Sequence, residues 1–219
     1  MAEKKKGAFI VIDGGDGAGK DTQIARIKSF FCGPVDILFT REPGGTAIGK
    51  QLRKVLLSSE NTALSPEAEL LLFSAARAQF MKEIVIPALK AGRNVVTNRF
   101  DSSTAAYQIY GRQREYLNPL FASINALALT DAETRIIYRP DMYILLDVSP
   151  KTGIMRKRNI PEEELRFERE PLDFHERVRA GFRAFLENEH KERHAVIDAN
   201  RDASAVWRDV KVCLAPFFL

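Results

Sequence analysis

The chain has 219 residues, with 33 lysines and arginines against 29 aspartates and glutamates and a formal net charge of +4. A hydrophobic fraction of 45% and a charged fraction of 28% are ordinary for a globular domain, which excludes a largely disordered, collagen-like or mucin-like chain. The small positive charge favours anionic ligands without requiring a nucleic-acid groove. Cys32 and Cys213 form no CxxC pair and give no support for a disulfide framework or a thiolate metal site.

Neither a secretory signal nor a membrane span is expected. The lysines near the N-terminus are followed by an apolar stretch of only Ala8–Ile12, which is too short for the core of a signal peptide. No uncharged apolar run approaches the ~20 residues that cross a bilayer. We therefore expect a cytoplasmic protein without a membrane partner.

Short apolar runs alternate with helical patterns along the chain. The runs predicted as strands are 9–12, 35–39, 95–97, 143–146 and 195–197. Helices are predicted at 20–31, 46–57 and 65–91, and another near Leu172. In the long segment, Ser65 is a candidate N-cap, Pro66 suits the first helical position, and Pro87 is expected to kink the end. This alternation predicts a single α/β domain over 1–219, a doubly wound five-stranded parallel sheet with helices on both faces.

A glycine-rich loop stands between the first strand and the first helix. Its sequence GGDGAGK, residues 14–20, matches the pattern GxxxxGK in the required strand–loop–helix context. Backbone N–H groups of such a loop face phosphate oxygens, and Lys20 can reach the β- and γ-phosphates. A dinucleotide-binding GxGxxG does not fit the spacing, and a turn that merely caps the helix is the remaining alternative. The residues expected to bind ATP are Gly14, Gly15, Gly17, Ala18, Gly19, Lys20, Asp21 and Thr22.

The loop departs from the usual pattern at Asp21, where a serine or threonine hydroxyl normally binds Mg²⁺. Thr22 carries a hydroxyl one residue later. A carboxylate is a suitable ligand for Mg²⁺, but it adds negative charge beside a triphosphate. We expect Mg²⁺ at Asp21 or Thr22, and whether Asp21 weakens nucleotide binding stays open.

Four separated motifs resemble those of the thymidylate kinases, in the order of that family and along nearly the whole chain. They are FIVIDGGDGAGKDTQ at 9–23, TREPGGT at 40–46, LLFSAARAQ at 71–79 and NRFDSSTAAYQ at 98–108. PDMYILLDV at 140–148 and a basic segment at about 155–170 follow. The resemblance implies a P-loop NTPase-type fold with a basic lid, and ATP- and Mg²⁺-dependent phosphorylation of dTMP to dTDP in dTTP synthesis. It also implies a homodimer, for which helix 65–91 is a candidate interface.

The resemblance implies roles for residues at the transferring phosphates. Arg99 is expected to bridge the acceptor phosphate and the transferred group, because two polyanions must be brought together. Arg41 and Arg53 lie in segments that bind or orient the acceptor phosphate in the family. Asp16 is expected to align the monophosphate, and Glu42 to support the site. A surface ion pair is the alternative for Arg53.

The resemblance also implies which residues recognise the thymidine part of dTMP. Phe73 resembles the aromatic plate on which thymine stacks, and Arg77, one helical turn later, resembles the donor to a thymine carbonyl. Thr104 and Gln108 can hydrogen-bond the edge of the base. Tyr107 is expected under the sugar, where it can exclude a 2′-hydroxyl.

A lid arginine is expected because Gly17 occupies a position where some family members carry an arginine. Members without it place catalytic arginines in the lid instead. Arg166 matches such a lid arginine best, with Arg158 and Arg169 aligned less clearly, and a charged loop without a catalytic share is the alternative. The residues expected to take part in the transfer are Lys20, Asp16, Arg99 and Arg166.

A second departure from the family lies at Asn98, where an aspartate usually precedes the arginine. Neighbouring parallel strands bring their carboxyl ends together, so we expect Asn98 near Asp21. The hypothesis is a compensated exchange that preserves the number of carboxylates near Mg²⁺.

Three other functions stay open from the sequence. The first is a P-loop kinase for another deoxynucleotide or a nucleoside. The second is a non-catalytic nucleotide-binding relative, which is favoured by the two departures from the family pattern near the expected Mg²⁺, Asp21 and Asn98. A nucleic-acid binder is the third, but scattered charges do not predict the basic face with aromatic platforms that it needs, and we expect no nucleic-acid partner.

Overall fold

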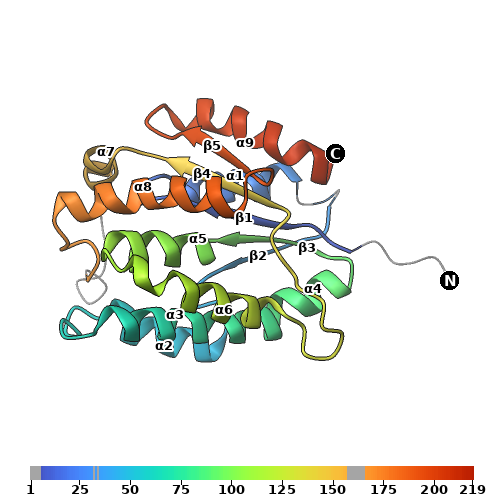
Figure 1. Ribbon diagram of the computed structural model, residues 1–219. Helices are drawn as coiled ribbons and strands as arrows, with labels where there is room; N and C mark the ends of the chain where they lie inside the picture. The colour runs from blue at the N-terminus through green and yellow to red at the C-terminus, as the bar shows by residue number, and fades with distance from the viewer. Residues whose placement is uncertain (1–5, 32, 34, 157–165) are drawn as a thin grey trace.

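The computed structural model describes residues 6–31, 33, 35–156 and 166–219. Five parallel strands form one sheet in the order β2-β3-β1-β4-β5 (Figure 1). They are β1 (Phe9–Asp13), β2 (Ile37–Arg41), β3 (Asn94–Asn98), β4 (Met142–Asp147) and β5 (His194–Asp198). The three central strands are almost entirely buried and the two edge strands are partly exposed. Continuous apolar runs are typical of such central parallel strands. The predicted α/β fold with a five-stranded parallel sheet is confirmed.

Helices cover both faces of the sheet, as predicted. They are α1 (Lys20–Phe31), α2 (Ala47–Leu57), α3 (Pro66–Phe80), α4 (Ile86–Lys90), α5 (Asp101–Thr104), α6 (Asn118–Leu129), α7 (Pro150–Arg156), α8 (Leu172–Glu189) and α9 (Ala203–Phe218). Two π-helical segments, η1 (Met81–Val85) and η2 (Ala105–Gly111), and a 3₁₀ turn, η3 (Glu115–Leu117), complete the set in the described ranges.

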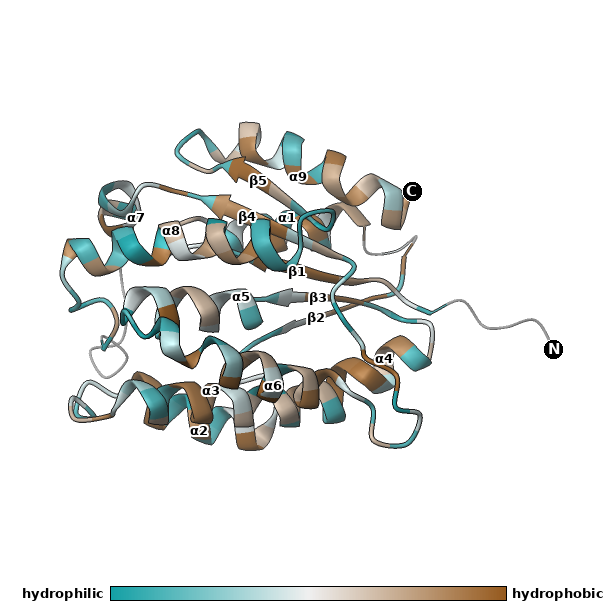
Figure 2. Ribbon diagram, viewed as in Figure 1, coloured by the Kyte–Doolittle hydropathy of each residue, from teal (hydrophilic) through white to brown (hydrophobic). Residues whose placement is uncertain are grey.

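The alternation of side chains along β1 sends its residues into two separate cores. Phe9 and Val11 pack with apolar residues of α3, α6, α8 and η2. Ile10 and Ile12 pack on the other face with residues of α1 and α9. Figure 2 shows apolar residues along β1, β4 and β5, and helices that carry both apolar and polar residues. This two-sided burial holds the central strands rigidly and fixes where their carboxyl ends lie.

The predicted long helix 65–91 forms as α3, η1 and α4 in direct succession. The Ser65 hydroxyl accepts a hydrogen bond from the Ala68 N–H at 3.2 Å, as expected for an N-cap. The π-helical turn 81–85 comes immediately before Pro87, which has no N–H to donate and disturbs the helical hydrogen bonds there. The helical hydrogen-bond pattern thus changes just before Pro87, where a kink is expected from the sequence.

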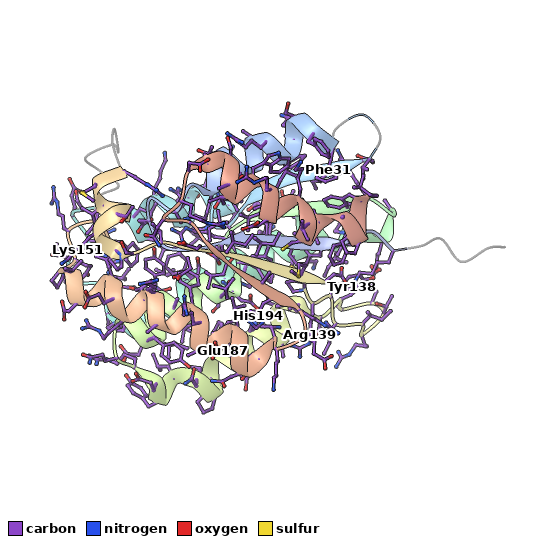
Figure 3. The ribbon with its side chains drawn as sticks, turned by 90° about the horizontal axis from the view of Figure 1, so that it is seen from above. Phe31, Tyr138, Arg139, Lys151, Glu187 and His194 are labelled. Carbon is purple, nitrogen blue, oxygen red and sulfur yellow. The ribbon has the colours of Figure 1, made fainter. Side chains whose placement is uncertain are left out.

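The second strand lies two residues later than predicted, at 37–41 instead of 35–39. Pairing with β3 sets its position, because Ile37 lies opposite Asn94 and Arg41 opposite Asn98. This register brings Arg41 to the carboxyl edge of the sheet. Figure 3 shows that edge, with Lys151 of α7 at the end of the molecule opposite Tyr138 and Arg139. Within the described ranges, no helix combines the length and apolar character that crossing a membrane requires.

Candidate active site

A cavity of about 690 Å³ opens at the carboxyl ends of the strands. Its walls come from the loop after β1, the ends of β2 and β3, η2, residues 167–168 and the loop after β5. Ligands of open α/β folds bind at this edge, where the strand order reverses. The cavity therefore lies where the fold predicts a nucleotide site.

The loop after β1 wraps around the ammonium group of Lys20. Its Nζ donates hydrogen bonds to the carbonyl oxygens of Gly14 at 2.9 Å and Gly15 at 2.8 Å. Gly17 and Gly19 have φ angles of 69° and 86°, which side-chain-bearing residues rarely adopt. The glycines thus permit the conformation that holds Lys20 inside the loop.

The backbone of this loop touches α7 directly. A Cβ added to Gly17 would lie 2.0 Å from the carbonyl oxygen of Gly153, and one added to Gly153 would lie 2.2 Å from the carbonyl oxygen of Asp16. Both distances are far shorter than a carbon–oxygen contact allows. With α7 in this position, a side chain such as that of arginine cannot replace Gly17.

Arg99 lies at the centre of a partly buried polar cluster beside the loop. Its guanidinium donates to Asp16 Oδ1 at 2.9 Å, the Gly14 carbonyl oxygen at 3.1 Å and Ser103 Oγ at 2.8 Å. The φ angle of Arg99 is 70°, a strained value that for a non-glycine residue costs ~1–3 kcal/mol. Such strain is found mainly at functional sites, where it fixes a side chain in one direction.

Tyr107 completes this cluster from η2. Its hydroxyl donates to Asp16 Oδ2 at 3.0 Å, and the Arg99 guanidinium lies 5.2 Å from the centre of its ring. Burial raises the pKa of Tyr107 well above its ordinary value, against the lowering effect of Arg99. Tyr107 therefore stays protonated and acts as a hydrogen-bond donor to Asp16.

Asp21 and Asn98 meet at the mouth of the cavity. Asn98 Nδ2 donates to Asp21 Oδ1 at 2.9 Å, which confirms the expectation that the two departures from the family pattern lie close together. Arg41 Nη2 lies 3.3 Å from the same oxygen. The Asp21 side chain is 82% exposed, so its carboxylate is open to ligands in the cavity.

The opposite part of the cavity is aromatic. The Phe73 ring lies 6.3 Å from that of Phe167, which makes an edge contact with Tyr107 at 5.6 Å between ring centres. Thr104 and Gln108 line the same region. An apolar slot with a few polar edges suits a planar base.

Arg77 lies behind this region and does not line the cavity. It is fully buried, pairs with Glu42 at 2.7 Å from Nη2 to Oε1, and donates to Thr104 Oγ1 at 2.6 Å. Burial raises the pKa of Glu42 to about 7, while Arg77 works in the opposite direction. In this arrangement Arg77 positions Glu42 and Thr104.

Arg166 also lies away from the phosphate loop. It is buried, donates to the carbonyl oxygens of Leu56 and Asn61 at 3.1 Å each, and forms an ion pair with Glu69. The guanidinium is thus tied to α2, to the loop that follows it and to α3. Arg158 lies outside the described residues, as does most of the segment predicted as a lid, and Arg169 is exposed.

Most of the predicted site residues line this one cavity. They are Asp16, Gly17, Ala18, Gly19, Lys20, Asp21, Thr22, Arg41, Glu42, Arg53, Phe73, Arg99, Thr104, Tyr107 and Gln108. Gly14 and Gly15 contribute carbonyl oxygens to Lys20 instead, and Arg77 and Arg166 lie outside the lining.

Sequence reasoning missed the wall that follows β5. Ala199, Arg201, Ala203 and Val206 line the cavity there, together with Arg156, which donates to the Ala199 carbonyl oxygen at 2.6 Å. The available signal was the position of this loop after a parallel strand, because loops at that edge face the ligand.

Comparisons with known proteins decide between the open interpretations. The sequence profile described as Thymidylate kinase matches residues 12–210. The chain is 43% identical over 202 residues to a thymidylate kinase of Desulfovibrio desulfuricans, covering 88% of each protein. It is 41% identical over 214 residues to one of Solidesulfovibrio magneticus, covering 91% of this chain and 96% of the other.

The chain belongs to the thymidylate kinase family. It is a dTMP kinase, a transferase of nucleotide biosynthesis that phosphorylates dTMP to dTDP. A kinase of this family uses ATP as the phosphoryl donor. The alternatives of a non-catalytic relative and of a kinase for another acceptor are thereby set aside.

Proposed function

We propose that both substrates bind in the cavity at the carboxyl edge of the sheet and that the γ-phosphoryl group passes directly between them. A bond forms between an oxygen of the dTMP 5′-phosphate and the γ-phosphorus, and the bond from that phosphorus to the ADP oxygen breaks. The observation that carries this proposal is the position of Arg99, 3.1 Å from a phosphate-loop carbonyl oxygen and within the same cavity as Phe73. Phosphoryl transfer requires positioning and charge neutralisation rather than covalent chemistry from the protein.

The donor nucleotide occupies the end of the cavity formed by residues 14–22. Backbone N–H groups of the loop and the N-terminus of α1 face its phosphates, and Lys20 extends from its present carbonyl partners to the β- and γ-oxygens. Ala203 and Val206 give this end an apolar wall for the nucleotide base.

The acceptor nucleotide occupies the aromatic end. Thymine stacks on Phe73, and Thr104 and Gln108 meet the edge of the base. Tyr107 lies beneath the sugar and leaves no room for a 2′-hydroxyl. Arg77 contributes through Thr104, which it contacts at 2.6 Å.

The acceptor phosphate then faces three arginines. Arg41, Arg53 and Arg99 line the cavity between the two ends, where two polyanions would otherwise repel each other. Asp16 accepts a hydrogen bond from Arg99 and thereby orients its guanidinium group. The role in the transfer that the sequence predicts for Arg166 would require its contacts with Glu69 and Leu56 to break.

The residues at the mouth of the cavity fit Mg²⁺. This ion binds through one or two carboxylates together with substrate phosphates, and Asp21 and Thr22 supply a carboxylate and a hydroxyl beside the loop. Bound Mg²⁺ supplies neutralisation of the phosphate charge, and Asn98 orients Asp21 for it.

A double-mutant cycle tests the exchange of Asp21 and Asn98. Asp21→Ser and Asn98→Asp each lower Mg²⁺-dependent ATP binding, and the double variant recovers most of the loss, because the number of carboxylates is restored. Calorimetric titration with and without Mg²⁺ measures binding separately from turnover. Additive losses in both binding and kcat/KM would refute the compensation.

A homodimer in the cytoplasm completes the proposal. Leu71 on α3 and Leu120 and Leu127 on α6 are exposed by 50%, 44% and 76%, and the two helices pack against each other. An exposed apolar face of this kind suits a second copy of the chain. Sedimentation of the wild-type protein and of Leu127→Glu tests the homodimer. The wild type is expected to be a dimer and the variant a monomer.

The reaction and its acceptor are tested by coupled measurement of ADP release with ATP and Mg²⁺. The acceptors are dTMP, dUMP, dCMP, dGMP and thymidine, and Arg99→Ala is the blank. Strong preference for dTMP, lost in Arg99→Ala, is expected. Undiminished turnover in Arg99→Ala would refute its role at the transferring phosphate.

A further inference from the structure

Glu69, on the first turn of α3, is a completely buried carboxylate that the transfer step does not use. Arg112 donates to its Oε1 at 3.1 Å, Arg166 pairs with the same oxygen, and Gln108 Nε2 donates to Oε2 at 3.1 Å. A buried carboxylate is unfavourable unless positive charge compensates it. The two guanidinium groups provide that compensation, so a carboxylate that can only accept hydrogen bonds faces Gln108.

Gln108 connects this carboxylate to the cavity. The side chain of Gln108 is 1% exposed and lines the acceptor end. Because Glu69 can only accept, the NH₂ group of the Gln108 amide must point toward it, and the amide oxygen is left on the other side. Within the part of the chain that the structure describes, this oxygen accepts no hydrogen bond, and it is not completely buried.

Pyrimidines differ in what they offer to such an oxygen. Thymine and uracil carry a hydrogen on ring nitrogen N3, which donates, whereas N3 of cytosine is an acceptor. An amide can normally rotate to suit either base, because its two ends are nearly equal in shape. Next to Glu69 the rotated amide would set its oxygen against a carboxylate oxygen, which is repulsive.

The geometry points to Glu69 as a positioning residue that selects bases with an N3–H group by fixing the Gln108 amide. The inference rests on the proposed function, in which Gln108 meets the edge of the base. Glu69 itself touches no substrate. It prevents the rotation by which Gln108 would accommodate dCMP, so the preference for dTMP over dCMP depends on a residue behind the cavity wall.

Glu69→Gln tests this, because a glutamine at 69 can either donate to or accept from the Gln108 amide. We expect the ratio of kcat/KM for dTMP to that for dCMP to fall at least about tenfold, mainly through a lower KM for dCMP. The ratio for dTMP to dUMP stays unchanged, because both bases carry N3–H. General damage to the site would not lower the dTMP:dCMP ratio while leaving the dTMP:dUMP ratio unchanged.

Glu170→Gln is the matched control. It makes the same chemical change on another partner of Arg112, without contact to Gln108, and should leave both ratios as in the wild type. Glu69→Asp retains the charge between the arginines and withdraws the oxygen from Gln108. It should lower the dTMP:dCMP ratio as well, and it serves as the test where Glu69→Gln does not fold.

Gln108→Ala separates the inference from the proposal on which it rests. An unchanged dTMP:dCMP ratio in the Glu69 variants, together with a lowered ratio in Gln108→Ala, would overturn the role of Glu69 and leave Gln108 as a reader of the base. An unchanged ratio in Gln108→Ala would overturn both. A fall in the ratio for Glu170→Gln equal to that for Glu69→Gln would also refute the inference.

Discussion

The contact between α7 and the phosphate loop predicts that a single methyl group can disable the enzyme from outside the cavity. In Gly153→Ala the added Cβ lies 2.2 Å from the carbonyl oxygen of Asp16, whereas carbon–oxygen contacts are ordinarily about 3.3 Å. The two backbones must therefore separate by roughly 1 Å. Asp16 holds Arg99 at 2.9 Å and Tyr107 at 3.0 Å, and these hydrogen bonds do not survive such a shift without rearrangement.

A misplacement of about 1 Å can lower an enzymatic rate about 100-fold, and we expect a loss of kcat/KM of this order. The effect on stability should be small. Overpacking costs about 1–3 kcal/mol, but alanine favours the helix over glycine by about 1 kcal/mol. The free energy of unfolding should therefore fall by less than about 2 kcal/mol.

Coupled ADP release with dTMP measures the loss, and urea unfolding measures the stability. Lys151→Ala is the control, because it changes an exposed residue on the same helix. A Gly153→Ala enzyme with kcat/KM within about threefold of the wild type would refute the reasoning, because Asp16 would then tolerate the displacement.

Three further predictions concern buried polar groups. Arg166→Ala should lower the free energy of unfolding by about 3–5 kcal/mol in urea titrations, because it leaves the Glu69 carboxylate undercompensated; a fall in kcat at unchanged stability would instead favour a catalytic role. Tyr107→Phe should lower kcat/KM for dTMP about tenfold by removing the hydrogen bond to Asp16, with stopped assays on both enzymes as the measurement. Burial raises the pKa of Glu42 from its ordinary value of 4.5 to about 7 in the folded protein, so protonation of this carboxyl stabilises the fold. This stabilisation is fully present at a pH below 4.5 and is lost as the pH rises through 7. Urea unfolding at pH 5, 6 and 7 should therefore show a fall in stability of up to about 3 kcal/mol that Glu42→Gln lacks.

Local patterns were sufficient to predict the strands, the phosphate loop and the helix start at Ser65. Each depends on neighbouring residues only: a buried apolar run, glycines before a lysine, or a hydroxyl before a proline. The start of β2 was misplaced by two residues because pairing with β3 decides it, and pairing is not visible in the run Val35–Phe39 itself. The wall after β5 was missed for the same reason, since its role depends on strand order.

Arg77 and Arg166 show that an arginine in the expected motif does not by itself determine what its guanidinium group contacts. Both are expected from the sequence to contact substrates, and in this structure both guanidinium groups are surrounded by protein partners. Each lies on a segment adjoining the cavity, so a displacement of one side chain separates a substrate contact from an internal one. Each guanidinium is paired with a buried glutamate, Glu42 for Arg77 and Glu69 for Arg166, and a buried carboxylate is unfavourable without such a partner. The arginines that line the cavity, Arg41 and Arg99, are also paired with carboxylates, but those carboxylates, Asp21 and Asp16, line the cavity themselves.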